Sequence, residues 1–313
     1  MPTGIEWTDE TWNPVTGCER ISPGCAHCYA KTLHDMRHKA YLKGSDVPEQ
    51  YSEPFEVVKC HADRLDTPLH WRAARMCFVN SMSDLFHHDV PFDFIGLSYA
   101  TMAIAKHITF QILTKRAERM LEFYRFIASS GRKSFKNSMT GEAIPWPLPN
   151  VWPGVSVENK RHLFRLDLLR QVPAPVRMVS FEPLLEDLTD EGTREVNLQG
   201  IGWGIVGGES GDGARDAHVA WMRYLIEQCD AQGVPPFVKQ VGARPVDWAD
   251  FRNRWPLGKP RLIADGHFLS YVDLRDRKGG DPEEWPEELR RREFPKPYPG
   301  HEVVRLKSKE AAA

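Results

Sequence analysis

Short apolar runs alternate with amphipathic helical patterns along most of the chain. Seven runs are typical of buried strands, at 11–15, 76–80, 108–113, 152–157, 176–181, 203–206 and 237–241. After His218, apolar residues recur with helical spacing at Met222, Leu225, Ile226 and Cys229. Similar helical stripes are predicted at Leu33, Met36 and Ala40, and at Leu121, Tyr124 and Ala128. Strands joined by helices are parallel, so the pattern predicts an α/β fold.

Polar residues follow nearly every predicted strand. They include Ser81, Ser83, Asp84, Lys115, Arg116, Glu158, Glu182, the 207–211 segment GGESG, Lys239 and Gln240. Barrel enzymes collect functional residues from the carboxyl ends of many strands, whereas a doubly wound sheet concentrates them at one switch point. The sequence therefore favours a full or partial (β/α) TIM-type barrel over a doubly wound sheet.

Two segments interrupt this alternation. The stretch 131–150, with Gly, Ser and Asn and the prolines of IPWPLPN, indicates an insertion within a barrel predicted to span 1–244. Beyond residue 244 the pattern indicates a small hairpin and a proline-rich segment, so 245–313 is predicted to be an extension that packs on the barrel.

Charge and composition limit which partners and which cellular location we expect for the protein. The chain has 41 basic and 43 acidic residues, a net charge of −2, so no overall positive field attracts a polyanion. The first 14 residues are charged where a signal peptide is apolar, and no apolar run approaches the ~20 residues that span a bilayer. We expect a cytoplasmic protein without membrane contact. The sequence does not indicate its oligomeric state.

Three of the six cysteines cluster near the N-terminus. Cys18, Cys25 and Cys28 have the spacing C-x6-C-x2-C, and Pro23 and Gly24 allow the bend that brings them together. In a reducing compartment such a cluster indicates metal ligation. Zinc sites and cubane clusters both take four ligands, and the three cysteines supply only three. Either the fourth ligand comes from another residue that the spacing does not reveal, or one iron of a cluster has no protein ligand. A zinc site could be completed by His27, His34 or His38; Cys60, Cys77 and Cys229 are interpreted as structural.

The segment Asn-Pro, Gly-Cys and Cys-x2-Cys-Tyr-Ala, ahead of the strand-helix alternation, resembles the cluster loop of radical S-adenosylmethionine enzymes, particularly the spore photoproduct lyase-like branch. The first gap is three residues longer than in the usual C-x3-C-x2-C. The whole chain resembles a phage-associated family of uncharacterised proteins through blocks such as IEWTDETWNPVTGC, NSMSDLFHHDVP, SFEPLLEDL and VGGESG.

This resemblance implies that Cys18, Cys25 and Cys28 hold a [4Fe-4S] cluster whose open iron binds S-adenosylmethionine. An electron donor would then allow cleavage to a 5′-deoxyadenosyl radical. The substrate is unknown, with a nucleobase in DNA or RNA as the candidate by analogy alone. His27 and Tyr29 are expected near the adenine.

The strand ends supply the remaining candidates. Expected catalytic residues are Lys115, Glu158, Glu182 and Glu209, and expected cofactor-binding residues are Ser81, Ser83, Asp84, Ser156, Gly207, Gly208 and Ser210. Asp84 could receive an ammonium group, or it could form a helix N-cap or turn. Lys115 and Arg116 could bind a carboxylate or phosphate, or they could simply begin a solvated helix. The 207–209 segment resembles the GGE element of radical enzymes but follows a late strand.

Two other functional classes remain open. One is a zinc-stabilised nucleic-acid-binding or nuclease protein that uses the acidic strand ends for metal. The other is a non-catalytic iron-sulfur sensory or phage accessory protein. Metal and sulfide content would separate them.

Overall fold

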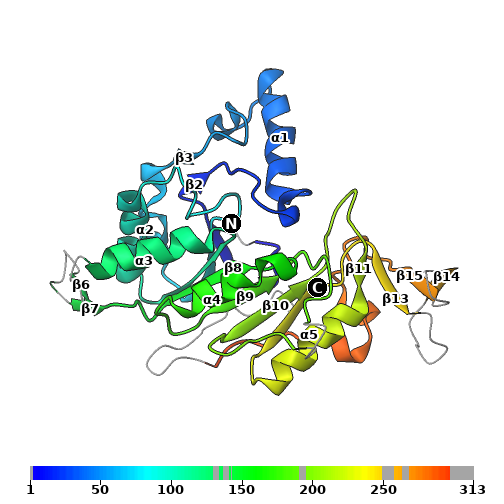
Figure 1. Cartoon of the computed structure of the whole chain (residues 1–313). Helices are drawn as coiled ribbons and strands as arrows, with labels where there is room; N and C mark the ends of the chain where they lie inside the picture. Colours follow the sequence, from blue (N-terminus) through cyan, green and yellow to red (C-terminus); the bar gives the residue numbers. More distant parts are fainter. Residues whose placement is uncertain are drawn as a thin grey trace.

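Seven parallel strands form the central sheet of the computed structural model, which describes residues 3–129, 134–136, 141, 143–189, 195–248, 257–262 and 268–296 (Figure 1). In sheet order they are β1 (Glu10–Trp12), β4 (Arg75–Val79), β5 (Ile108–Thr114), β8 (Val151–Ser156), β9 (Met178–Phe181), β10 (Trp203–Gly207) and β12 (Pro236–Gln240). They correspond to the seven predicted strands. The order never reverses, whereas a doubly wound sheet reverses at its switch point.

The sheet curls into a half-barrel rather than a closed one. Strands β1 and β12 are its two edges, so the partial barrel is confirmed and the full TIM barrel does not form in the described part of the chain. The edge of β12 is covered by residues 291–293: Val238 N donates to Arg291 O at 2.7 Å, and Glu293 N donates to Pro236 O at 3.0 Å. This pairing occupies backbone groups that barrel closure would otherwise use.

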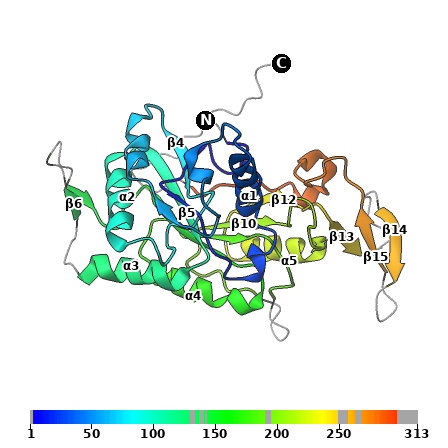
Figure 2. The same ribbon diagram turned by 90° about the horizontal axis from the view of Figure 1, so that it is seen from above.

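Four helices cover the outer face of the sheet: α2 (Phe92–Ile104), α3 (Ala117–Ser129), α4 (Phe164–Arg170) and α5 (Val219–Ala231) (Figure 2). The predicted apolar face of α5 is buried as expected. Cys77 and Val79 of β4 and Val179 of β9 face the same layer and pack in one core cluster with these helices. Burial on the helix side explains why the strands are apolar at these positions.

The inner face of the half-barrel is filled by aromatic and aliphatic side chains. Trp152, Trp203 and Phe237 come from three strands, and they pack with Trp7 from the N-terminal segment. Phe294 from the C-terminal segment packs against Trp203, with ring centroids 5.1 Å apart. The interior is therefore a packed core, and the polar groups collect at the carboxyl ends of the strands.

Helix α1 (Tyr29–Leu42) differs from its prediction. Its expected apolar stripe does not face the sheet, because Met36 is 60% exposed, whereas the buried residues are Ala30 and His34. The helix stands away from the sheet (Figure 1), and His34 packs edge-on against Tyr51 and Phe55. The helical period was predicted correctly, but the surface that the helix covers was not.

Smaller elements connect these layers. Strand β2 (Val15–Thr16) pairs with β3 (Lys59–Cys60), and β6 (Ser134–Lys136) pairs with β7 (Ala143–Pro145) inside the predicted insertion. The 3-10 turns are η1 (Pro23–Cys25), η2 (Glu49–Tyr51), η3 (Ala62–Arg64), η4 (Thr67–His70), η5 (Lys160–His162), η7 (Pro282–Glu284) and η8 (Glu287–Leu289).

The C-terminal region contributes a second sheet in the order β11 (Ala217–His218), β13 (Pro245–Trp248), β15 (Phe268–Val272) and β14 (Leu257–Leu262). Strands β14 and β15 form the antiparallel hairpin that the sequence predicted. Trp285, which follows η7, is 2% exposed, and residues 297–313 of the predicted extension lie outside the described residues.

Among the helices that the structure describes, none combines the length and apolarity needed to cross a membrane.

Candidate functional site

The three clustered cysteines lie on residues 17–28, here called the cysteine loop, between β2 and α1. Gly17 has a φ of +85°, and a Cβ there would lie 2.3 Å from the carbonyl oxygen of Val57, so only glycine fits. Cys18 N donates to Phe55 O at 2.9 Å, and Gly17 forms an isolated parallel bridge with Ser83 beyond β4. The backbone therefore fixes Cys18 beside the carboxyl end of the sheet.

The other two cysteines flank the start of α1. Cys25 ends the turn η1, and its sulfur lies 3.7 Å from Ser22 Oγ. Cys28 is the residue before α1, and its carbonyl accepts from Thr32 N at 3.0 Å. All three thiols are free and half-buried. Their sulfurs do not all lie within 4.8 Å of one another.

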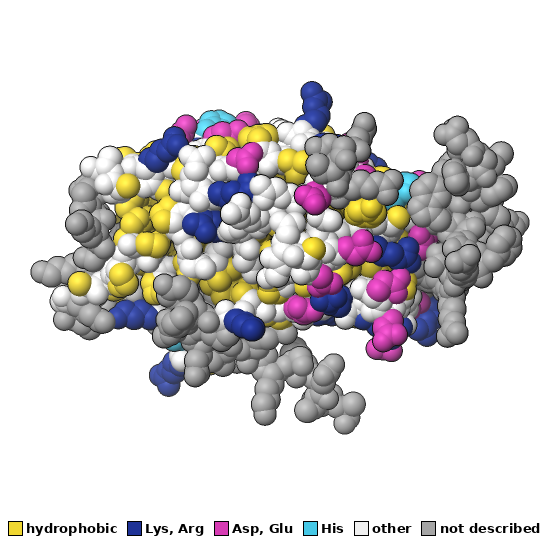
Figure 3. Space-filling model, turned by 60° about the horizontal axis from the view of Figure 1, so that its bottom comes forward, with side chains coloured by type: hydrophobic (Ala, Val, Ile, Leu, Met, Phe, Trp, Pro, Cys, Tyr) yellow, Lys and Arg dark blue, Asp and Glu magenta, His cyan; other side chains and the backbone are white. Residues whose placement is uncertain are grey.

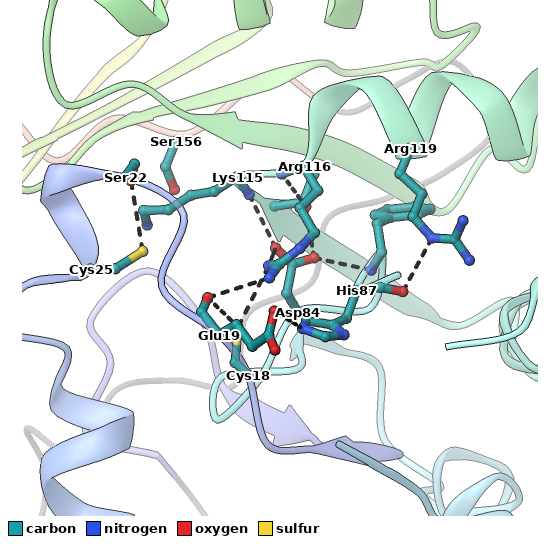
Figure 4. Close-up of polar contacts among 12 residues, drawn as sticks. Cys18, Glu19, Ser22, Cys25, Asp84, His87, Lys115, Arg116, Arg119 and Ser156 are labelled. Atoms are coloured by element: carbon teal, nitrogen blue, oxygen red, sulfur yellow. Dashed lines mark hydrogen bonds and ion pairs between the residues drawn. The ribbon is translucent and has the colours of Figure 1, made fainter. Parts of the chain in front are cut away.

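Arg116, which lies between β5 and α3, connects the cysteine loop to the sheet (Figure 4). Its Nη1 donates to Cys18 Sγ at 3.5 Å and to Asp84 Oδ2 at 3.2 Å, and its Nη2 donates to Glu19 O at 3.3 Å. Burial and Asp84 raise the pKa of the Cys18 thiol to about 12, against the lowering effect of Arg116. Arg116 thus holds Cys18 through a charge-assisted contact.

The Asp84 carboxylate accepts hydrogen bonds that hold two neighbouring segments of the fold together. It accepts from Phe86 N at 3.0 Å, Thr114 Oγ1 at 2.7 Å and Lys115 N at 3.2 Å, in addition to Arg116. These bonds connect the turn after β4 to the start of α3. The arrangement matches the turn alternative for Asp84, because the bonds from Phe86 N to its carboxylate and from His87 N to its carbonyl close a turn after β4.

Glu158, two residues after β8, joins the cysteine loop to the sheet from another side. It is fully buried, its Oε1 accepts from Gly24 N at 3.4 Å, and its Oε2 accepts from Arg165 Nη1 at 2.9 Å. Burial opposes ionisation, but Ser22, Lys115 and Arg165 lower the pKa of the carboxyl below its ordinary value. Glu158 is therefore a paired carboxylate that supports η1.

Glu209, after β10, makes the third connection. His27 Nδ1 lies 2.9 Å from its Oε2, and Arg215 donates to both carboxylate oxygens, at 3.0 Å from Nε and 2.6 Å from Nη2. Arg215 Nη2 also donates to Pro23 O at 3.1 Å. Burial acts to raise the pKa of Glu209, but the hydrogen bonds from Arg215 and His27 lower it to about 2.

We expect this carboxylate to make stability pH-dependent in acid. Because the folded-state pKa of Glu209 is lowered, its contribution is complete above the unfolded value of about 4.3 and is lost as pH falls toward 2. In the parent protein, the free energy of unfolding measured with urea should fall between pH 5 and pH 2. In Glu209→Gln this fall should be smaller. In the exposed Glu122→Gln it should be unchanged; equal slopes for parent and Glu209→Gln would contradict the assignment.

A layer of polar side chains faces inward at the carboxyl ends of the strands. Side chains alternate along a strand, so Ser156 shares the inner face with Trp152. The register of β12 against β10 shifts at Lys239, whose side chain is located by its contact with Glu182. Ser156 pairs in register with Ser180 of β9. Lys239 Nζ contacts Glu182 Oε1 at 2.5 Å, with both side chains less than one-fifth exposed. This layer lies above the apolar core.

Lys115 places a positive charge near Glu158 and Cys25, and this charge acts to lower the pKa of both groups. Its ammonium makes no hydrogen bond or ion pair within the described part of the chain, and Figure 4 shows it extended toward Ser22, Cys25 and Ser156. Burial acts to raise the pKa of Cys25, but Lys115 and hydrogen bonds near Ser22 lower it. A cation is therefore available beside one of the thiols.

Several other predicted residues have structural partners. Tyr29 Oη donates to Ser81 O, Ser81 Oγ donates to Asn13 Oδ1 at 3.3 Å, and Ser83 Oγ donates to Val15 O at 2.7 Å. A Cβ at Gly208 would lie 2.5 Å from Val241 O, and one at Gly207 would lie 3.4 Å from Glu182 Cδ. Gly208 thus allows close chain packing, while Ser210, next to Glu209, is half-buried.

The structure adds three arginines that sequence reasoning did not pair with these carboxylates. Arg116 was noted only beside Lys115, while Arg165 lies on α4 and Arg215 lies in the loop after β10. Arg165 follows Glu158 by seven residues and is buried on α4, but Glu158 lies in the loop before that helix, so helical spacing did not mark the pair. Arg215 lies in a segment without periodicity, so no pattern marked it.

Comparison with known proteins identifies the family. The family model described as Protein of unknown function (DUF5131) matches residues 2–288. The chain belongs to this family. The match spans the cysteine loop, the whole half-barrel and the strand ends described above. No curated protein and no solved structure matches this DUF5131 member. The family description states no activity, so the radical-enzyme and phage resemblances stay predictions.

Proposed function

We propose that this DUF5131 protein is an iron-sulfur enzyme of the radical S-adenosylmethionine type, in which Cys18, Cys25 and Cys28 hold a [4Fe-4S] cluster. One observation carries the proposal. Three free, half-buried thiols lie on a single loop at the carboxyl edge of a half-barrel, and the ends of three strands contact that loop directly. Enzymes built on such barrels collect their chemistry at this edge.

The donor set supports a cluster better than a mononuclear zinc site. With Zn–S bonds of about 2.3 Å, a tetrahedral zinc ion holds its sulfurs about 3.8 Å apart, whereas the three sulfurs here do not all lie within 4.8 Å. A cubane cluster holds its thiolates farther apart because each binds a different iron atom. The basic side chains Lys115 and Arg116 would offset part of the thiolate charge.

Such a cluster, when bound, supplies one electron to the sulfonium of S-adenosylmethionine. The chain's own residues would position the participants. Arg116 holds Cys18, and the Lys115 ammonium beside Cys25 suits the carboxylate of the cosubstrate. The pair of Glu182 and Lys239 offers both charges at the inner layer. An electron donor is required by this proposal.

A nucleobase substrate in DNA or RNA would require a local basic surface on the protein. On the face shown in Figure 3, Lys and Arg side chains are interspersed with Asp and Glu. The net charge of −2 supplies no general attraction for a polyanion.

The test is cosubstrate cleavage by the reconstituted protein. After anaerobic loading with iron and sulfide, the reduced protein should convert S-adenosylmethionine to 5′-deoxyadenosine, measured by chromatography. Lys115→Met should weaken cosubstrate binding roughly 10-fold or more, whereas the exposed Lys160→Met should leave it unchanged. A colourless protein that holds one zinc ion, or a reduced cluster that yields no 5′-deoxyadenosine, would refute the proposal.

A further inference from the structure

A second group of metal-binding side chains lies next to the cysteine loop. One ligand atom each from Glu19, His87 and His88 lies within 4.8 Å of the others. Glu19 Oε2 is 3.8 Å from His87 Nε2, and Figure 4 shows the carboxylate facing that imidazole ring. The group joins the cysteine loop to the turn that follows β4. It is separate from the three thiols.

His87 supplies the decisive observation. Its side chain is fully buried, and its Nε2 is a buried nitrogen without a hydrogen-bond partner. A buried polar atom left unpaired costs about 1–3 kcal/mol. The residue is held in place by its backbone, because its N donates to Asp84 O at 3.0 Å and its carbonyl accepts from Arg119 Nε at 3.1 Å. The backbone hydrogen bonds therefore hold His87 Nε2, which has no hydrogen-bond partner, in a position that faces Glu19.

Asp89 occupies the position of an outer partner. Its carboxylate oxygens lie 3.6 Å from His87 Nδ1 and 3.3 Å from His88 Nε2. Histidine ligands commonly donate their second ring N–H to such a carboxylate, which orients the ring and fixes its tautomer. At present Asp89 N donates to His87 Nδ1 at 3.2 Å, which places the neutral ring's proton on Nε2. Metal ligation by Nε2 requires that this proton leave and that Nδ1 carry the proton facing Asp89.

We propose that Glu19, His87 and His88 bind a divalent first-row transition-metal ion. Two imidazoles and one carboxylate suit such ions and leave coordination positions open for water or a ligand. The two rings are stacked with centroids 4.3 Å apart, so one must turn for both to bind. His88 can do this because its side chain is 60% exposed.

A bound ion would affect the cysteine loop directly. Glu19 is adjacent to Cys18, and its carbonyl already accepts from Arg116. Fixing the Glu19 carboxylate to the two histidines would connect the start of the cysteine loop to the turn after β4. The metal would thus order the loop, whatever group the three thiols hold. An ordinary ion pair between Glu19 and His87 is the competing explanation.

Cobalt titration of the full chain distinguishes these possibilities. Because the free thiols of the parent chain can themselves bind cobalt, the decisive sample is Cys25→Ala/Cys28→Ala, in which we expect one Co2+ per chain with a spectrum that lacks thiolate-to-cobalt charge transfer. His88→Ala and Glu19→Gln should each weaken this binding at least 10-fold. Both targets are exposed, so these variants should fold, which circular dichroism can verify. The matched control is His70→Ala, which removes another exposed histidine.

Three results would overturn the proposal. The first is no cobalt uptake beyond the thiols, with all binding lost in Cys25→Ala/Cys28→Ala. The second is unchanged binding in folded His88→Ala. The third is an equal loss in His70→Ala. Because the cysteine variant lacks the proposed cluster but keeps this group, failure of one site can be told from failure of the other.

Discussion

Cys25→Ala is expected to reduce the iron content of the anaerobically reconstituted protein from about four atoms per chain to a small residue. Each thiolate would hold one corner of the proposed cluster, so two remaining protein ligands would not retain it. Iron, acid-labile sulfide and visible absorption measure the loss. Stability should change little, because Cys25 is half-buried on a loop and packs against polar rather than apolar neighbours.

Cys60→Ala is the matched control for this substitution. Cys60 is an exposed free thiol on β3, and it pairs with Val15 of β2, two residues before Gly17. It therefore tests a thiol at the base of the same loop without removing a proposed ligand. Full iron content is expected. If both variants lost iron equally, or if Cys25→Ala kept it, the three-cysteine assignment would be wrong.

The positions of the strands could be predicted from the sequence because each is buried on both faces. The apolar runs around Phe110 and Val179 contact helices on one side and the inner core on the other, so their hydrophobicity is continuous. Polar residues such as Glu158 and Glu182 then mark the strand ends. What the runs cannot show is closure. The pairing of residues 291–293 with β12 depends on a segment with no strand pattern of its own.

The roles of the carboxylates were harder to predict, for a physical reason. A Glu after a strand is expensive to bury unless it is paired, and the sequence shows the Glu but not its partner. Glu209 is paired with Arg215, and Glu182 is paired with Lys239, which is 57 residues away. Such pairings depend on how loops meet at the sheet edge. The same limitation applied to His34, whose burial depends on Tyr51 and Phe55.

These pairings also show how the cysteine loop is supported. Arg116, Glu158 and Arg215 reach it from the ends of three different strands and donate to or accept from its backbone at Glu19, Gly24 and Pro23. The loop itself has only the short turn η1. Its geometry is therefore determined by charged side chains of the half-barrel, so a change in one of those pairs should affect both folding and ligand retention.

We expect Arg165→Met to lower the stability of the protein more than Cys25→Ala does, because it breaks one of these buried pairs. Arg165 is 2% exposed and donates from Nη1 to Glu158 Oε2 at 2.9 Å and to Ser156 O at 2.8 Å. Removing one partner of a buried ion pair leaves the other charge buried without a partner, at a cost of about 3–5 kcal/mol. The free energy of unfolding, measured with urea, should fall by that amount.

The iron content of folded Arg165→Met should fall as well, because Glu158 also accepts from Gly24 N in the cysteine loop. Arg161→Met is the control: Arg161 lies four residues earlier and is exposed, so its loss should change stability by less than about 0.5 kcal/mol. A loss for Arg165→Met no larger than that of the control would mean that Glu158 is stabilised by Gly24, Ser22 and Lys115 alone. The ion pair would then not be what holds the cysteine loop to β8.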